Sequence, residues 1–355
     1  MKRLLEIPEY IEDVNRVASL DLPWENLRGK TILITGGTGL IGSFLIDVLK
    51  AANLSCKVLL FGRSEEKAQA RFAEYWNEGW IEFVKWDAGC SESLNLRKEG
   101  AEEIDFVLHL ASNTHPVAYA TDPIGTITAN VIALNNLLSL AAEKKATRFL
   151  FASSNEIYGE NRGDVELFAE TYCGYINCNT LRAGYPESKR CGEALCQAYI
   201  RQKGLDCVIA RLTRTYGPTI LPTDTKAISQ FFCNALKGRD IVLKSEGRQF
   251  FSYQYVSDSV AGLLTILLKG ELGEAYNIAD ESGDITLRDL ASLIAKQAGH
   301  KVVFDLPDSV EAAGFSKATK ARLDGSKMRR LGWFPYYDIT KGIARNMEIA
   351  FACID

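Results

Sequence analysis

Residues 31–50 read TILITGGTGLIGSFLIDVLK, and this stretch decides the fold. It opens with a run of β-branched and aliphatic residues that predicts a buried strand over 31–35. Three glycines follow, at Gly36, Gly39 and Gly42, and an apolar helical pattern continues after them. In this context Gly36 allows a tight turn, Gly39 lets a pyrophosphate approach the backbone, and Gly42 lets the helix pack closely. The sequence therefore predicts a dinucleotide-binding turn, with a purely structural glycine turn as the alternative.

The bulk composition is that of an ordinary globular protein. The chain has 355 residues, of which 47% are hydrophobic and 24% charged, and its formal net charge is −4. This length predicts a full core and two lobes, and the acidic balance gives no indication of a nucleic-acid surface. No continuous apolar run approaches the roughly 18 residues that span a bilayer, so we expect no membrane segment. The acidic N-terminal stretch does not have the pattern of a signal peptide.

The nine cysteines form no CxxC pair. Cys191 and Cys196 fall in one predicted helix, but no histidine lies near them in sequence to complete a zinc site. We therefore expect free thiols, no bound metal and a location in the reducing cytoplasm.

Strands and helices alternate along the first half of the chain. Apolar strand patterns cover 57–62, 81–87, 105–111 and 148–154, and helical patterns lie between them. This alternation predicts an α/β fold, with a parallel, doubly wound sheet of the Rossmann type. The ligands of such a sheet bind beyond the carboxyl ends of its strands.

The chain divides into three predicted parts. Residues 1–29 form an N-terminal extension with an amphipathic helix, for which we expect a packing or oligomer-contact role. Residues 30–212, together with about 245–272, form a dinucleotide-binding domain. Residues 213–244 and 273–355 form a smaller C-terminal α/β lobe that we expect to bind the substrate.

The end of the second strand bears on the choice of cofactor. An acid about 20 residues after the last glycine would bind the two hydroxyls of the adenosine ribose. That place holds Gly62 and Arg63, with no acid before Glu65. A guanidinium without a competing acid favours a 2′-phosphate, and hence NADP over NAD; a solvated arginine in a turn is the alternative. Asp87, at the end of the third strand, is either an acceptor for the adenine amine or a turn residue.

A second motif, YPESK, opens a helix about 30 residues after the strand predicted at 148–154. Tyr185 and Lys189 are four residues apart and so share one helical face. A lysine ammonium beside a phenol, near a positive nicotinamide ring, favours the phenolate that removes a hydroxyl proton during hydride transfer. Ser153 and Ser154, at the end of the strand, supply a hydroxyl that can share the substrate oxygen with the tyrosine. The spacing alone is a weak signal, because Tyr and Lys are often four apart in helices.

Together these motifs resemble the extended short-chain dehydrogenases that act on nucleotide sugars, the NAD-dependent epimerase/dehydratase family. The resemblance runs from about residue 30 to 336. It rests on GGTGLIG, HLAS at 109–112, SSNEIYGE at 153–160, YPESK, RTYGP at 214–218 and YQYVSD at 253–258. Within the family the chain is most similar to the UDP-glucuronate decarboxylase branch, in the segment YCGYINCNTLRAGYPESKR and in the ungapped run from His109 to Asn130.

This resemblance implies an enzyme that oxidises a nucleotide-diphosphate sugar at C4 with bound NAD or NADP and works through a 4-keto intermediate. Decarboxylation is the favoured outcome. The alternatives are epimerisation at C3, C5 or C4, reduction of a 4-ketosugar with NADPH, and a non-catalytic NADP-binding protein. The resemblance also implies a homodimer formed through the helices that start near Asp122 and Tyr185.

The resemblance assigns catalytic roles to individual residues. Tyr185 and Lys189, with Ser154 polarising the substrate oxygen, would carry the oxidation. Glu156 would act as acid or base on carbon, with a structural carboxylate as the alternative. Asn155 stands where the 4,6-dehydratases have one of a pair of acids, so it disfavours dehydration.

The binding residues complete the prediction. The predicted cofactor contacts are Gly36, Thr38, Gly39, Leu40, Ile41, Gly42, Arg63, Asp87, Ala88, Leu110, Ala111, Ser112, Tyr185 and Lys189, and the predicted substrate contacts are Tyr119, Arg182, Arg214 and Arg248. Two departures from the family stand out. Phe251 occupies the place of the family's diphosphate-binding arginine, with Arg248 close by, and Arg214 replaces the asparagine of the NTYGP motif. They predict a reshaped diphosphate or sugar pocket, with a surface position for Arg214 as the alternative.

Overall fold

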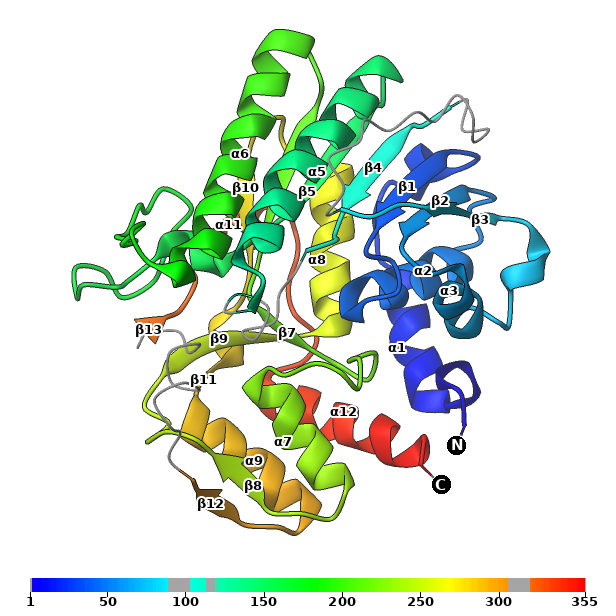
Figure 1. Ribbon diagram of the computed structural model, residues 1–355. Coiled ribbons are helices and arrows are strands. Elements are labelled where there is room, and N and C mark those ends of the chain that lie inside the picture. The colour runs from blue at the N-terminus through cyan, green and yellow to red at the C-terminus, as the bar shows by residue number, and fades with distance from the viewer. Residues whose placement is uncertain (1, 89–102, 113–118, 120, 306–319, 355) are drawn as a thin grey trace.

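A parallel sheet forms the centre of the computed structural model, which describes residues 2–88, 103–112, 119, 121–305 and 320–354 (Figure 1). Its strand order is β10-β6-β5-β4-β1-β2-β3, and each of these pairings is parallel. The strands are β1 (Thr31–Thr35), β2 (Lys57–Gly62), β3 (Ile81–Lys85), β4 (Phe106–His109), β5 (Arg148–Ser154), β6 (Cys207–Leu212) and β10 (Ala275–Ile278). The predicted α/β, doubly wound architecture is confirmed.

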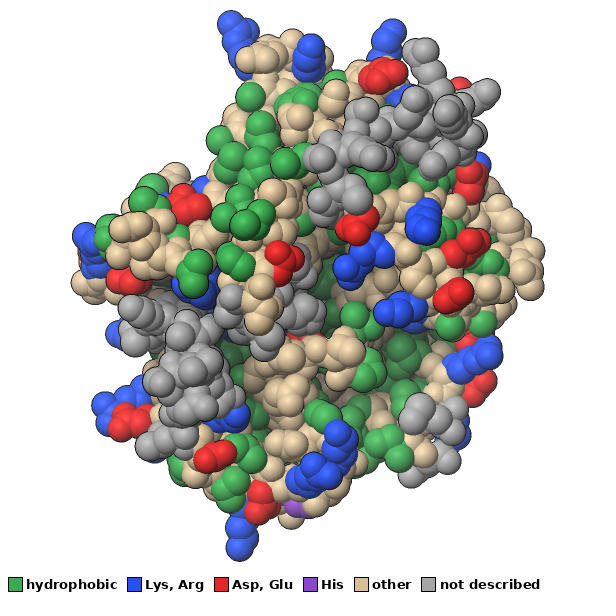
Figure 2. Space-filling view, viewed as in Figure 1, with side chains coloured by type: hydrophobic (Ala, Val, Ile, Leu, Met, Phe, Trp, Pro, Cys, Tyr) green, Lys and Arg blue, Asp and Glu red, His purple; other side chains and the backbone are tan. Residues whose placement is uncertain are grey.

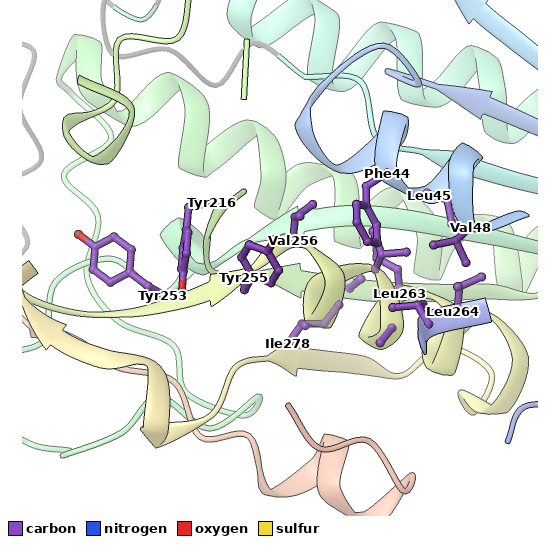
Figure 3. Close-up of a cluster of buried hydrophobic side chains, with 14 of the residues drawn as sticks. Phe44, Leu45, Val48, Tyr216, Tyr253, Tyr255, Val256, Leu263, Leu264 and Ile278 are labelled. Atoms are coloured by element: carbon purple, nitrogen blue, oxygen red, sulfur yellow. The ribbon is translucent and has the colours of Figure 1, made fainter. Parts of the chain in front are cut away.

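Helices cover both faces of this sheet, which explains why its strands are apolar throughout. On β1, Ile32 and Ile34 belong to one buried cluster and Leu33 to the other. The first cluster includes residues of α2 (Leu40–Ala51) and α8 (Val256–Lys269), and the second includes residues of α5 (Pro123–Glu143) and α6 (Gly184–Lys203). Figure 3 shows side chains of α2 facing those of α8. Side chains alternate between the two layers with the period of two that a strand imposes.

A second, smaller lobe is built around a four-stranded sheet. In it β9 (Phe250–Tyr255) pairs with β7 (Arg214–Tyr216), β11 (Asp284–Thr286) and β13 (Lys320–Ala321), while β8 (Ile241–Leu243) pairs separately with β12 (Val302–Phe304). The other described α-helices are α1 (Pro8–Ala18), α3 (Glu65–Arg71), α7 (Ala227–Leu236), α9 (Leu287–Ala298), α11 (Ser326–Arg330) and α12 (Ile339–Ala352). Figure 1 shows α7, α9 and α12 together with β8 and β12 below the large sheet.

The strand pairing differs from the predicted domain boundaries in two places. β9 lies within the segment assigned to the dinucleotide-binding domain, but it pairs with the strands of the smaller lobe. β10 lies within the segment assigned to the smaller lobe, but it pairs in parallel with β6 at the edge of the large sheet. The chain crosses between the lobes where β9 ends and α8 begins, at Tyr255 and Val256. A short apolar strand pattern gives no indication of which sheet it joins.

The N-terminal extension packs against both lobes through α1. Tyr10 is fully buried and donates a hydrogen bond to Asp47 of α2. One turn later, the buried Asp13 carboxylate accepts hydrogen bonds from the hydroxyls of Tyr255 and Tyr337, at 2.9 and 2.6 Å. Arg345 of α12 also lies 3.3 Å from this carboxylate. Residues 1–29 therefore connect the two lobes on the side where β9 meets α8.

Helix α5 requires a correction to the sequence analysis. It is 21 residues long, with a mean hydropathy of 1.4 over an 18-residue window, and so it is long and apolar enough to cross a membrane by these two measures. Half of that window is buried inside the structure. The buried side chains pack on α6 and β4, and this packing accounts for the apolar composition of a helix in a doubly wound fold.

Candidate active site

A cleft of about 1420 Å³ opens at the carboxyl ends of β1, β2, β4 and β5 and extends along the smaller lobe. Every predicted cofactor contact lines it, as do the predicted catalytic residues Ser154, Asn155 and Glu156. Of the predicted substrate contacts, Tyr119, Arg182 and Arg214 also line the cleft. The structure thus brings residues from distant parts of the chain to one cavity.

The glycine turn leaves no room for side chains. Gly36 has φ +71°, and a Cβ atom there would lie 2.8 Å from the backbone nitrogen of Ala111. A Cβ atom on Gly42 would lie 2.4 Å from the carbonyl oxygen of Gly36. Helix α2 starts directly after Gly39, which has no side chain to cap the helix. The first N–H groups of α2 therefore face the cleft without a side-chain cap, and this arrangement fits a bound pyrophosphate.

Tyr185 occupies the first turn of α6 and is buried beside the end of β5. Burial raises the pKa of its phenol and the Glu156 carboxylate adds to this effect, whereas hydrogen bonds from Ser154 and Ser112 act in the opposite direction. Tyr119 stacks on the phenol ring, with the ring centroids 4.9 Å apart. The sequence analysis expected a lysine ammonium to lower this pKa, but in the protein alone burial dominates the balance.

Lys189 lies one turn further along α6 and is 2% exposed. Its Nζ atom donates a hydrogen bond to the carbonyl oxygen of Ala152, at 2.8 Å, and lies 5.9 Å from the centre of the Tyr185 ring. Burial lowers the pKa of Lys189 to about 7, and the carboxylate of Glu193 only partly offsets this. The ammonium is therefore anchored to the strand rather than directly to the phenol ring.

A chain of hydrogen bonds supports the backbone of the tyrosine from α5. The Ser112 hydroxyl donates to the side-chain oxygen of Asn130, at 2.7 Å. The Asn130 amide donates in turn to Ser188, at 2.9 Å, and the Ser188 hydroxyl donates to the carbonyl oxygen of Tyr185, at 2.7 Å. The sequence analysis did not assign Asn130 a role. Its only signal was a polar residue within an apolar helix.

Glu156 and Arg182 form an ion pair at the edge of the cleft. The Arg182 Nη2 atom lies 2.7 and 2.6 Å from the two carboxylate oxygens of Glu156. The guanidinium also lies 4.7 Å from the centre of the Tyr119 ring, on which Tyr185 is stacked. Asn155, beside Glu156, is buried. A predicted catalytic acid and a predicted substrate-binding arginine therefore contact each other in this structure.

The two arginines of the smaller lobe have different surroundings. The Arg214 guanidinium lies over the Phe251 ring, 3.5 Å from its centroid, and faces the cleft. The side chain of Arg248 is 83% exposed and pairs with Glu246 at 2.7 Å. Arg248 does not line the cleft, so the structure does not bring it together with the other predicted substrate contacts. It lies in the connection between β8 and β9, where a local ion pair holds it toward solvent.

The far end of the cleft was missed by the sequence analysis. Several residues line it that no motif indicated: Phe231, Val242, Leu243, Lys244, Ser245, Gln249 and Asp305. Trp86 and Phe61 likewise line the cofactor end. These residues come from separate strands, helices and connections, and only the fold brings them together. Among the described residues, no three His, Cys, Asp or Glu side chains are grouped to hold a metal ion.

The fold and the cleft are those of an α/β protein with a glycine turn before α2 and with Tyr185 and Lys189 on α6, all lining one cleft. A sequence model of the NAD dependent epimerase/dehydratase family matches residues 32–279. The chain belongs to this family, as the sequence motifs predicted.

Curated relatives and solved structures agree with this assignment. The chain is 32% identical over 321 residues to UDP-glucuronic acid decarboxylase 6 of Arabidopsis thaliana, covering 88% of this chain and 86% of that protein. It is 31% identical over 322 residues to UDP-glucuronic acid decarboxylase 1 of Xenopus tropicalis, covering 90% and 72%. The dTDP-glucose 4,6-dehydratase DesIV of Streptomyces venezuelae, solved with NAD and TYD bound, is 25% identical with a TM-score of 0.77, covering 90% and 96%. The UDP-glucose 4-epimerase of Thermotoga maritima shares the fold, with a TM-score of 0.78 at 23% identity, covering 92% and 100%.

The pKa of Lys189 predicts how stability depends on pH. The folded value of about 7 lies below the ordinary value of 10.5, so between these values the unfolded chain binds a proton that the folded chain does not. Wild-type stability therefore rises with pH in this window relative to that of Lys189→Met. The quantity to compare is the free energy of unfolding of Lys189→Met minus that of wild type. We expect this difference to be about 2 to 3 kcal/mol more positive at pH 6 than at pH 9.

Urea unfolding of both proteins at the two pH values measures this difference. The control is Lys203→Met, which changes an exposed lysine at the end of the same helix and should show the same difference from wild type at both pH values. A pH-independent difference for Lys189→Met would mean that this lysine is not destabilised by burial.

Proposed function

We propose that this protein modifies a nucleotide-diphosphate sugar by oxidising it at C4 with bound NAD or NADP, and that it acts as a decarboxylase on a substrate of the UDP-glucuronate type. The observation that carries the proposal is the meeting of the glycine turn, Tyr185, Ser154 and Glu156 in one cleft. The names of the curated relatives support the choice of a UDP-glucuronate decarboxylase. Asn155 supports it as well, because an amide cannot supply the proton that dehydration requires.

The cleft residues suit a nicotinamide dinucleotide. The backbone from Gly36 to Gly42 and the start of α2 would bind the pyrophosphate, because Gly39 leaves the first N–H groups of the helix without a side-chain cap. Ala111 and Ser112, at the end of β4, and Asp87, after β3, line the same end of the cleft. The bound cofactor would take up a hydride from C4 of the sugar and later return it.

Tyr185 is the base for the first step. Its phenol oxygen would take the proton of the 4-hydroxyl group while Ser154 donates a hydrogen bond to the same substrate oxygen. Lys189, held on Ala152 at 2.8 Å, contributes a positive charge beneath this group when it is protonated. The hydrogen bonds through Asn130 and Ser188 hold the first turn of α6 in position.

Glu156 belongs to the second step. A ketone at C4 makes a carboxylate on C5 a β-keto acid, so the C5–carboxyl bond breaks and CO₂ leaves with an enolate behind it. The enolate must then take up a proton at C5 before the ketone is reduced again. Arg182 orients Glu156 by contacting both of its carboxylate oxygens. Glu156 would pass this proton to C5.

Replacing Tyr185 tests this function. Tyr185→Phe removes the proton acceptor and keeps the ring that stacks on Tyr119. We expect turnover of UDP-glucuronate to fall by about 100-fold or more, while nucleotide binding changes little. Mass spectrometry of the product should show UDP-pentose and loss of CO₂ for the wild type.

The control variant is Tyr175→Phe, which changes a tyrosine that is 45% exposed and should keep full activity. A product of unchanged mass would exclude decarboxylation and leave an epimerase. A variant Tyr185→Phe with wild-type turnover would contradict the assignment of the base.

NADP is the slightly favoured cofactor. Gly62 and Arg63 end β2 at the rim of the cleft, where a guanidinium suits a 2′-phosphate better than a free ribose diol. An NADPH-dependent 4-ketosugar reductase is the second candidate function, because the same pair suits net reduction. The solved dehydratase DesIV holds NAD, so NAD is the alternative cofactor.

The variant Arg63→Asp tests the cofactor preference. We expect NADP binding to weaken by about 10-fold or more and NAD binding to stay equal or improve, because a carboxylate repels the phosphate and accepts bonds from the diol. Titration calorimetry with both cofactors gives the ratio. Arg201→Asp, at an exposed position of α6, is the control. A wild type that prefers NAD, with no change in Arg63→Asp, would contradict the NADP assignment.

A homodimer through α5 and α6 completes the proposal. Three apolar side chains near the starts of these helices are exposed: Ile124 at 76%, Ile127 at 42% and Leu181 at 69%. Figure 2 shows hydrophobic side chains gathered over the two helices. A patch of this kind supports association with a second copy of the chain.

Sedimentation equilibrium measures the assembly. Wild type should sediment as a dimer, and Ile124→Glu should weaken the dimer because it buries a charge in the apolar patch. Leu272→Glu, which alters a leucine that is 56% exposed just after α8, should leave the mass unchanged. A wild-type monomer at micromolar concentration would contradict the proposed dimer.

A further inference from the structure

Arg214 is a cation that forms no ion pair with any of the described residues. It lies at the start of β7 and lines the cleft. Its guanidinium lies over the ring of Phe251, with Cζ 3.5 Å from the ring centroid. The Nη1 atom is buried and has no hydrogen-bond partner among the described residues. A guanidinium keeps its charge in such surroundings. Arg214 therefore lines the cleft with one of its donors buried and unpaired.

The charged groups around Arg214 do not supply the missing partner. The largest electrostatic influences on Arg214 come from Tyr253, Glu156, Arg182 and Tyr119. Both oxygens of Glu156 are already within 2.7 Å of Arg182. Burial raises the pKa of Tyr119, and it raises that of Tyr253 to about 12, so both phenols are neutral near pH 7. Glu156 is therefore paired with Arg182 and not with Arg214.

The cost of this arrangement indicates that a ligand completes it. An unpaired buried charge is costly, and a cation–π contact offsets only part of this cost. The stacking on Phe251 holds the plane of the guanidinium, and a planar fork of donors matches the oxygens of a phosphate or a carboxylate. Arg248 is close to Phe251 in sequence, but it faces solvent and cannot provide this contact.

We propose that Arg214, stacked on Phe251, is the anion-binding residue of the cleft and binds one oxyanion group of the substrate beside the catalytic residues. The identity of the whole substrate rests on the function proposed above. The oxyanion comes either from the diphosphate or from a carboxylate on the sugar. Both sources share the same chemistry, because each presents two oxygens to one guanidinium.

Binding measurements on two variants test the inference. Arg214→Met removes the charge and keeps the length and apolar contact of the side chain on Phe251. Arg248→Met removes an arginine that is 83% exposed and serves as the matched control. The probes are inorganic pyrophosphate, UDP, UDP-glucose and UDP-glucuronate, with dissociation constants from titration calorimetry and melting temperatures from fluorimetry.

The four probes distinguish the two sources of the anion. If Arg214 binds the diphosphate, Arg214→Met should weaken all four probes by about 10- to 100-fold. If it binds the carboxylate, only UDP-glucuronate should weaken. Arg248→Met should leave all dissociation constants within about twofold of the wild type. Wild-type affinity of Arg214→Met for every probe would overturn the inference.

Stability provides a second readout that a structural role would not produce. Removing an unpaired buried charge should leave Arg214→Met without ligand at least as stable as wild type. If the stack on Phe251 serves only the fold, the variant should melt lower and bind all probes normally, which would overturn the inference. Arg214→Lys provides a further test, because it keeps the charge but loses the planar fork and should recover part of the lost affinity.

The outcomes also separate this inference from the proposed function. A wild type that binds pyrophosphate through Arg214 but binds no nucleotide sugar would overturn the function and support the inference. If wild type and Arg214→Met bind UDP-glucuronate with equal affinity, the inference is overturned and the function stays in place.

Discussion

The contact between the Gly36 carbonyl and helix α2 at Gly42 is the constraint on which the rest of the molecule depends. A single methyl group on Gly42 would lie 2.4 Å from that oxygen, so the helix can start where it does only because both residues lack side chains. This start fixes α2 against the sheet, and α8 packs on α2 (Figure 3). The cleft then forms above the first turn of α2, since the carboxyl ends of the neighbouring strands reach the same edge.

The smaller lobe is connected rigidly to this foundation. β9 passes directly into α8 at Val256, so a strand of one lobe and a core helix of the other form one continuous segment. On the same side, Asp13 of α1 binds Tyr255, Tyr337 and Arg345 together. A buried carboxylate with three partners is costly to break, because each partner would lose its hydrogen bond in a dry environment. These connections hold Arg214 and Phe251 in the same cleft as Tyr185.

Local chemistry explains how much of this could be predicted from the sequence. The glycine turn and the Tyr185–Lys189 pair are encoded within a few residues each, so the fold class and the predicted cofactor contacts could be placed from the sequence. The partners of Glu156 and Arg214 were not, because Arg182 and Phe251 reach them only through the tertiary fold. For the same reason Arg248 was expected in the cleft but faces solvent. Proximity in sequence to Phe251 does not fix the side on which a connecting segment leaves the sheet.

If Arg214 binds the substrate as proposed, the group that its guanidinium holds bears on which product the reaction gives. Loss of CO₂ moves the electron pair of the C5–carboxyl bond into the sugar, and the carboxylate loses its negative charge. A cation bound to the carboxylate therefore stabilises the starting state more than the transition state. An arginine bound to the carboxylate would thus slow decarboxylation and favour reactions that keep the carboxylate on the sugar. The same arginine on a phosphate would leave the carboxylate unrestrained. The placement of one side chain can therefore select between two fates of a shared keto intermediate without changing the residues that form it.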